Sequence, residues 1–296
     1  MTRHIVLGAL LVVGGLSVAI AQQQAPRPAL PDLTKVKDNL YVITSSTPGP
    51  EFTGGNTGVL VTDTGVVVVD TKLAGYGPDI LTKIRKVTDK PITMVINTHT
   101  HGDHTGSNEA FPATIDFVAQ ENTKANMTKM DGFKGEKAAF LPKRTFKDKM
   151  TVGNGKNRID LYYFGPGHTN GDAWVAYPAL RVLQTGDMFA WRDAPTIDRN
   201  NGGSGIEYPK TVAKAIAGIK DIDTVIPGHS PLTTPKDLQE FQRFLADWVA
   251  AVQSAAAAGK SIDEAVASIN LTSKYPNFKN ERYKNAVTAV YAELGK

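Results

Sequence analysis

One short segment of the chain concentrates residue types that bind metal ions. Residues 99–104 read His-Thr-His-Gly-Asp-His and follow residues 92–97, an apolar run typical of a buried strand. In an extended loop, residues two apart point the same way, so His99 and His101 can converge on one cation. Asp103 and His104, on the turning chain, can then face another. The spacing therefore predicts a site that holds two ions side by side.

Three later residues supply what this segment lacks. His168, Asp187 and His229 each follow a β-type run and lie beside a glycine, so each is expected in a loop at a strand end. A single His or Asp in such a place is usually a structural group. The chain has six histidines, however, and all except His4 belong to these motifs. Their joint occurrence indicates one composite site rather than separate structural residues.

The composition limits the chemistry of that site. The chain has no Cys, which excludes thiolate ligands, a Cys nucleophile, disulfides and a lipoprotein anchor, so a metal must be held by His and carboxylates. The net charge is +4, with Lys and Arg scattered along the chain. This distribution favours a small-molecule substrate, with a modest preference for anions. It lacks the basic patch that a nucleic-acid partner requires.

The N-terminus predicts export. Arg3 precedes an apolar run over residues 5–20, and Ala19 and Ala21 occupy the small-residue positions before a cleavage site. We expect residues 1–21 to be a signal peptide, with a periplasmic or secreted mature protein that has no stable membrane association. An uncleaved anchor is the alternative, although the run is shorter than the roughly 20 apolar residues of a spanning helix. Residues 22–34, rich in Gln and Pro, read as a flexible leader.

The elements that must position the site follow from the remaining pattern. Residues 35–296 suit one domain. A tight turn at residues 63–65 joins two strands, and an amphipathic helix begins at Pro78, with Ile80, Ile84 and Val87 on one face. Residues 234–296 form a helical segment, in which Thr234 and Ser261 begin two helices with capping boxes. Strands are expected at residues 40–43, 59–62, 66–70, 92–97, 114–119, 159–164, 173–177, 181–183 and 224–226.

In these residues the chain resembles the metallo-β-lactamase superfamily. The His-x-His-x-Asp-His motif, a later His, a later Asp and a last His occur in the family's order between residues 40 and 229. The resemblance implies an α/β fold, the αββα four-layer sandwich, with additional C-terminal helices here. It also implies a dinuclear zinc site in a cleft at one edge of the two packed sheets.

The resemblance further implies a role for each residue. His99, His101 and His168 would hold the first zinc ion, Asp103, His104 and His229 the second, and Asp187 would bridge them. Asp70, at the end of the strand over residues 66–70, matches a family position that supports the metal loop. Two zinc ions suit hydrolysis because they generate hydroxide near neutral pH and polarise the oxygen under attack. Asp103 is the expected catalytic residue, accepting the proton of the water.

The identity of residue 187 favours one group of substrates. Among relatives in this superfamily, two groups of true β-lactamases have Cys or Ser at this point, whereas Asp is the pattern of the glyoxalase II-like and lactonase branches. The sequence therefore favours cleavage of an ester, thioester or lactone by a metal-bound hydroxide. The alternative is a periplasmic metallo-β-lactamase acting on β-lactam amides, which export supports. A noncatalytic zinc-binding recognition protein is a third hypothesis.

Loops around the cleft are expected to set the specificity. The candidates are residues 47–55, residues 188–192 and residues 200–208. Within them, Phe52 is a candidate lid residue, Trp191 a candidate substrate-loop residue, and Arg192 a candidate partner for a substrate carboxylate. The alternative for Phe52 and Trp191 is simple packing, and for Arg192 a solvated position.

Overall fold

Two β-sheets form the centre of the molecule. The computed structural model describes residues 27–45 and 49–296. The first sheet runs β1-β2-β3-β4-β5-β6-β7, antiparallel up to β4 and parallel from β4 to β7. Its strands are Thr34–Lys37, Leu40–Ile43, Thr57–Val61, Val66–Val69, Ile92–Ile96, Asp116–Gln120 and Arg144–Phe146.

The second sheet has the order β12-β11-β10-β9-β8, and β11 and β12 are its parallel pair. It comprises β8 (Lys149–Val152), β9 (Ile159–Tyr162), β10 (Trp174–Tyr177), β11 (Val182–Gln184) and β12 (Thr224–Ile226).

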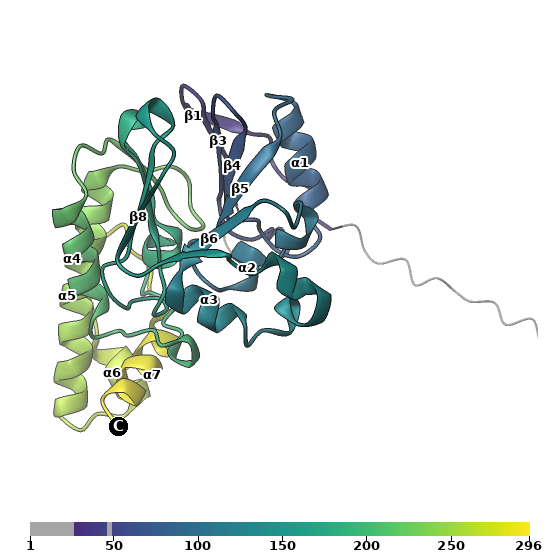
Figure 1. Cartoon of the computed structure of the whole chain (residues 1–296). Helices are drawn as coiled ribbons and strands as arrows, with labels where there is room; N and C mark the ends of the chain where they lie inside the picture. The colour runs from purple at the N-terminus through teal and green to yellow at the C-terminus, as the bar shows by residue number, and fades with distance from the viewer. Residues whose placement is uncertain (1–26, 46–48) are drawn as a thin grey trace, which may run out of the picture.

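Helices cover the outer face of each sheet (Figure 1). On the first sheet lie α1 (Gly77–Arg85) and α3 (Glu121–Met127), and the one-turn helix α2 (Gly102–Thr105) contains the second half of the motif at residues 99–104. On the second sheet lie α4 (Tyr208–Gly218) and the long α5 (Pro235–Ala257), followed by α6 (Ile262–Ser268) and α7 (Tyr283–Glu293). The predicted αββα sandwich with C-terminal helices is confirmed.

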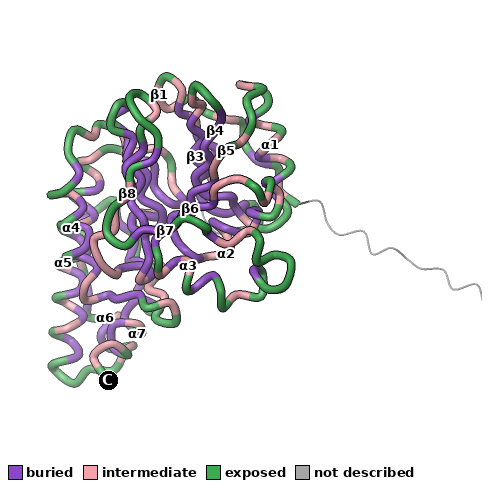
Figure 2. Tube along the Cα trace, in the orientation of Figure 1, coloured by how far each residue is buried: buried purple, intermediate pink, exposed green. Residues whose placement is uncertain are grey.

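Three apolar clusters correspond to the three interfaces between these four layers. Alternation along β4 shows the principle, because successive residues of a strand face opposite sides. Val67 and Val69 join the cluster between the two sheets, whereas Val66 and Val68 join the cluster beneath α1. The third cluster packs α4–α7 on the second sheet. The inner strands of both sheets, such as β3, β4 and β10, are accordingly buried (Figure 2).

The C-terminal helices begin as their sequence predicts. Thr234 and Ser261 each close a capping box, in which the hydroxyl accepts from the third helical N–H and that residue's carboxylate accepts from the cap. The predicted apolar stripe of α5 is buried: Leu238, Phe241, Leu245, Trp248 and Val252. Within the described residues, no helix is both long and apolar enough to span a bilayer.

The structure differs from the sequence prediction at the N-terminal side. The predicted signal peptide, residues 1–21, and the first part of the leader lie outside the described residues. The described part of the leader is not loose, so that prediction is wrong there. Leu30 is buried in the cluster beneath α1, and Tyr76 donates a hydrogen bond to the Pro28 carbonyl. Val87 is another correction, since α1 ends before it and its side chain is exposed.

Candidate metal centre

The metal-binding motif, residues 99–104, lies at one edge of the first sheet. It follows β5, which pairs in parallel with β4 and β6, so its loop emerges at the carboxyl ends of neighbouring strands. His99 and His104 are buried, while His101 and Asp103 are partly exposed to a cleft. The loops after β9, β11 and β12 bring His168, Asp187 and His229 to the same place from the second sheet. Both sheets therefore contribute to one site.

The first group contains His99, His101 and His168, whose candidate ligand atoms all lie within 4.8 Å of one another. His101 Nδ1 is 2.9 Å from His168 Nε2. The other ring nitrogens of these two residues are engaged, since His101 Nε2 lies 2.7 Å from Asp198 Oδ2 and His168 Nδ1 lies 2.8 Å from the Thr196 carbonyl. With protons on those engaged nitrogens, the lone pairs of His101 Nδ1 and His168 Nε2 face each other, an arrangement that a metal ion between them would satisfy.

The second group contains Asp103, His104 and His229. Asp103 Oδ2 is 3.3 Å from His229 Nε2, and the Nε2 atoms of His104 and His229 are 3.2 Å apart. Two nitrogens on one tetrahedral zinc ion are separated by about 3.3 Å, given Zn–N bonds of about 2.0–2.1 Å. The spacing therefore suits a shared ion.

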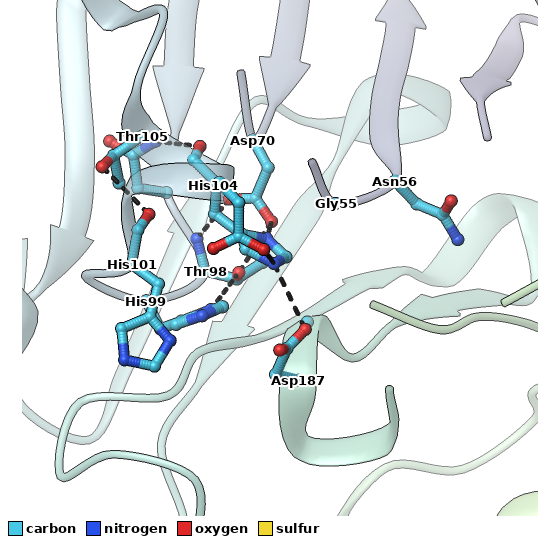
Figure 3. A network of polar contacts seen from close by, with 12 residues as sticks. Gly55, Asn56, Asp70, Thr98, His99, His101, His104, Thr105 and Asp187 are labelled. Atoms are coloured by element: carbon cyan, nitrogen blue, oxygen red, sulfur yellow. Dashed lines mark hydrogen bonds and ion pairs between the residues drawn. The ribbon is translucent and has the colours of Figure 1, made fainter. Parts of the chain in front are cut away.

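Asp187 lies between the two groups. Its Oδ1 is 3.2 Å from Nε2 of both His104 and His229, and its Oδ2 is 3.7 Å from His168 Nε2. Figure 3 shows its carboxylate directed at the His104 ring. Gly228 permits this approach, because a Cβ there would lie 2.1 Å from Asp187 Oδ1. Asp187 therefore contacts residues of both groups.

The donor atoms fit metal ions on two further observations. His99 Nε2 is fully buried yet has no hydrogen-bond partner among residues 27–45 and 49–296, which is costly unless the atom binds something else. Burial also lowers the pKa of His99 and of His168, so both imidazoles are neutral, as ligands must be. Burial opposes ionisation of Asp187, but His229 and His104 hold its pKa well below the ordinary value.

Asp70 supports the second group as the sequence predicts. It is fully buried, and its oxygens accept from the Thr98 N–H at 2.8 Å and the Thr98 hydroxyl at 2.7 Å. Its Oδ2 also lies 2.7 Å from His104 Nδ1, which leaves His104 Nε2 free to face an ion (Figure 3). Gly55 is required beside this pair, since a Cβ there would lie 2.2 Å from the His104 ring.

Asp198 is a site residue that the sequence did not reveal. It orients His101, and that hydrogen bond holds the pKa of Asp198 well below its ordinary range. Two N–H groups of the turn that it begins, those of Asn200 and Asn201, also donate to it. The backbone N–H of Asp198 donates to the His168 carbonyl, so its loop is bound to the other side of the same group. No motif or spacing around Asp198 signals this role.

A cleft of about 700 Å³ opens onto the two groups. Phe52 and Trp191 both line it, with ring centroids 5.4 and 5.3 Å from that of His229. Arg192 does not line it. Its guanidinium pairs with Asp237 and lies 3.7 Å from Glu240, both on α5, so the predicted contact with a substrate carboxylate at the metal site is wrong.

Comparison with known proteins gives one family match and several relatives. A family model described as the metallo-beta-lactamase superfamily matches residues 50–229. The metallo-beta-lactamase type 2 of Elizabethkingia meningoseptica is 29% identical over 211 residues, which cover 67% of this chain and 78% of that protein. The metallo-beta-lactamase type 2 of Bacillus sp. (strain 170) is 25% identical over 175 residues, covering 58% of this chain and 65% of that protein.

Among solved structures, the metallo-beta-lactamase from Pontibacter korlensis superimposes with a TM-score of 0.63 at 21% identity. The match covers 73% of this chain and 99% of that chain. At this identity the likeness shows a common fold alone.

Proposed function

The chain belongs to the metallo-β-lactamase superfamily and is therefore a metal-dependent hydrolase; on this premise we propose that it holds two zinc ions and opens the amide bond of β-lactams. The observation that carries the proposal is the convergence of seven donor residues at the cleft floor, in two groups that share Asp187. An all-His/carboxylate donor set of this kind suits zinc.

The residues at the metal centre have separate roles in the proposed hydrolysis. His99, His101 and His168 would hold one ion, Asp103, His104 and His229 the other, and Asp187 both. When bound, such ions activate water near neutral pH and polarise the carbonyl under attack. Asp103, partly exposed at the cleft, accepts the proton of the attacking water and returns it to the leaving nitrogen. Phe52 and Trp191 pack against the His229 ring and line the cleft beside this group.

The choice of β-lactams rests on the relatives. Two curated bacterial relatives carry the name metallo-beta-lactamase, and this support outweighs the preference that the sequence expressed for esters, thioesters and lactones. Asp187 keeps those substrates as a second candidate function. The resemblance implies Cys or Ser here in true β-lactamases, whereas Asp187 brings a carboxylate within 3.7 Å of residues of both groups.

Hydrolysis of three substrates tests the proposal. Zinc-loaded protein is assayed with a chromogenic cephalosporin, an aryl ester and a γ-lactone, with chelator-treated protein as the control. We expect chelator-sensitive turnover of the cephalosporin. Turnover of the ester or lactone with none of the cephalosporin would favour the second candidate, and turnover of none would contradict both. Bound zinc near two ions per chain is the accompanying expectation, and one ion at saturating zinc would contradict the dinuclear assignment.

Export is part of the same proposal. It is supported by the arrangement of Arg3, the apolar run and Ala21, and a periplasmic location would bring the enzyme to β-lactams. N-terminal sequencing of the protein from the producing cell checks it. A mature chain that begins at Gln22 is expected, and Met1 on a soluble cytoplasmic protein would reject export.

A further inference from the structure

One side of the metal cleft is apolar and is formed mainly by residues 130–140, here called the strap. Met130, Phe133 and Phe140 of the strap line the cleft, together with Leu73 of the segment after β4. The strap consists of two 3-10 helices, Asp131–Phe133 and Gly135–Phe140, and most of its other side chains face solvent. Its apolar side chains are therefore concentrated on the cleft side.

The strap is fixed to the catalytic part of the molecule at both ends. The Thr100 hydroxyl, between His99 and His101, donates to Met130 Sδ at 3.3 Å. At the other end, the Phe140 ring lies edge-on to Phe117 of β6, with centroids 6.0 Å apart. These contacts hold the apolar surface at a set place relative to the metal-binding loop, so it can select a part of the substrate.

The charges around the cleft point to the same kind of ligand. Of the described residues that line it, Lys137 is the one Lys or Arg, and its Nζ lies 2.7 Å from Glu109 Oε2. A charged substituent entering here would meet a cation that is already neutralised. An apolar substituent would meet Met130, Phe133 and Phe140 and would gain free energy with each buried methylene.

The Lys137–Glu109 pair also marks the end of the apolar surface. A second pocket of about 520 Å³ lies beyond it, lined by Gly75, Gly77, Ser107 and Ala110. Glu109, Lys137 and Phe140 line both hollows, so the pair stands where the cleft and the second pocket meet. Both partners are about half exposed, and such pairs contribute little to stability. The pair can therefore be broken without damage to the fold.

We propose that the strap forms a subsite for an apolar substituent of the substrate, and that the Lys137–Glu109 pair limits the length of that substituent. This inference rests on the proposed function, since the substituent is carried by the molecule whose bond is hydrolysed. It assigns the specificity of the cleft to residues outside the metal ligands.

A homologous series of substrates tests the subsite. Penicillins with n-acyl side chains from acetyl to dodecanoyl are hydrolysed by the zinc-loaded protein, and kcat/KM is recorded against chain length. We expect a rise of about two- to fourfold per methylene, the fold-change that partial to full burial of a CH₂ gives, up to a limiting length. In the Glu109→Gln variant the rise should continue to longer chains. An unchanged profile in this variant, or a flat profile in the parent, would overturn the inference.

Asp131→Asn is the matched control. It removes one carboxylate from an exposed pair of the same strap, Asp131–Lys134, which lines neither hollow. Its length profile should equal that of the parent, and a profile shifted as in Glu109→Gln would mean that charge alone, not the position of the pair, is responsible.

Binding of unreactive ligands separates this inference from the proposed function. N-acylglycines of the same chain lengths contain no strained amide, and their Kd is measured by the change in tryptophan fluorescence, since Trp191 lines the cleft. A Kd that falls with chain length supports the subsite even if no penicillin is hydrolysed, in which case only the proposed function fails. A Kd independent of chain length overturns the subsite, even if hydrolysis is rapid.

Discussion

A single carboxylate, Asp198, controls the orientation of His101. Its Oδ2 lies 2.7 Å from His101 Nε2 and thereby directs Nδ1 at the group formed with His99 and His168. Partners of this kind typically change metal affinity by about 10–100-fold when they are removed. We predict that Asp198→Ala weakens zinc at the first group by this factor and leaves the second group nearly unchanged. Two-step competition titration with a chelator measures both affinities.

Asp198→Asn is the informative companion variant. The amide oxygen can still accept from His101 Nε2–H, but the negative charge is lost, so its effect should lie between those of the parent and Asp198→Ala. If both variants retained the parent's two affinities, the contact with His101 would be incidental. If both weakened the two groups equally, Asp198 would act on the whole fold rather than on one group.

At this scale the sequence predicted the site well for one physical reason. Metal binding requires particular residue types, and five histidines confined to three glycine-flanked motifs leave few alternatives. The seven donor residues and Asp70 accordingly meet in the structure. Asp198 and Arg192 show what the sequence could not predict about the site. Asp198 acts across 97 residues of sequence, and Arg192 is satisfied by acidic residues of α5, so neither role could be known before the chain was folded.

The connection between strands β2, β3 and β4 depends on Lys72. This side chain is fully buried just after β4, and its Nζ donates to the carbonyls of Thr44 at 3.2 Å and Gly55 at 2.8 Å. It thus ties the end of β2 to the loop that leads into β3, beside His104. Burial lowers the pKa of Lys72 to about 7. The Lys72 amine therefore links these two backbone segments, and its burial costs least free energy when the amine is neutral.

The stability that buried Lys72 contributes should therefore depend on pH. In the unfolded chain Lys72 keeps its ordinary pKa of about 10.4, so between pH 7 and 10 the unfolded state binds more protons than the folded state. The contribution of Lys72 to the free energy of unfolding must then rise with pH in this window. Below about pH 7 the amine is charged in both states, so the folded state carries the full penalty for burying that charge. We predict that Lys72→Met loses stability relative to the parent by a few kcal/mol more at pH 9.5 than at pH 6.5.

Denaturant unfolding of zinc-saturated parent and variant at the two pH values measures this difference, because other titrating groups are common to both. Lys90→Met is a suitable control, since Lys90 donates to the Thr62 carbonyl from an exposed position. Its stability difference should not depend on pH. A Lys72→Met difference that is constant with pH would show that the buried amine does not titrate in this range.

Elements with strong local signals were predictable, and elements held by tertiary contacts were not. The hairpin at residues 63–65 and the two capping boxes follow from local chemistry and are present. The edge strands β1, β7 and β8 were missed, because they are three or four residues long and carry exposed charged side chains in place of an apolar run. Arg27 and Leu30, which pack on α1 and Tyr76, belong to a segment whose composition suggests a free leader.

The whole molecule is divided between its two sheets, and the metal centre joins them. Asp103 and His104 follow β5 of the first sheet, whereas Asp187 and His229 follow β11 and β12 of the second. An apolar cluster between the sheets also holds the halves together. The order of the motifs along the chain let the sequence predict this arrangement, but the strap and the Asp198 loop, which complete the site, are visible only in three dimensions.

Zinc should therefore raise the stability of the entire fold. A ligand at about 1,000 times its Kd adds about 4 kcal/mol to the free energy of unfolding, and in a domain of this size each kcal/mol raises Tm by roughly 2–4 °C. We predict a Tm at least about 8 °C higher in zinc than in chelator, measured by calorimetry.

Because each ion needs ligands from both sheets, His104→Ala and His229→Ala should each abolish the same part of this zinc-dependent increment. Comparing increments rather than absolute Tm values removes the direct cost of each substitution to the metal-free fold. If His229→Ala kept the full increment, the second ion would be held by the first sheet alone, and the metal centre would not connect the two halves of the molecule.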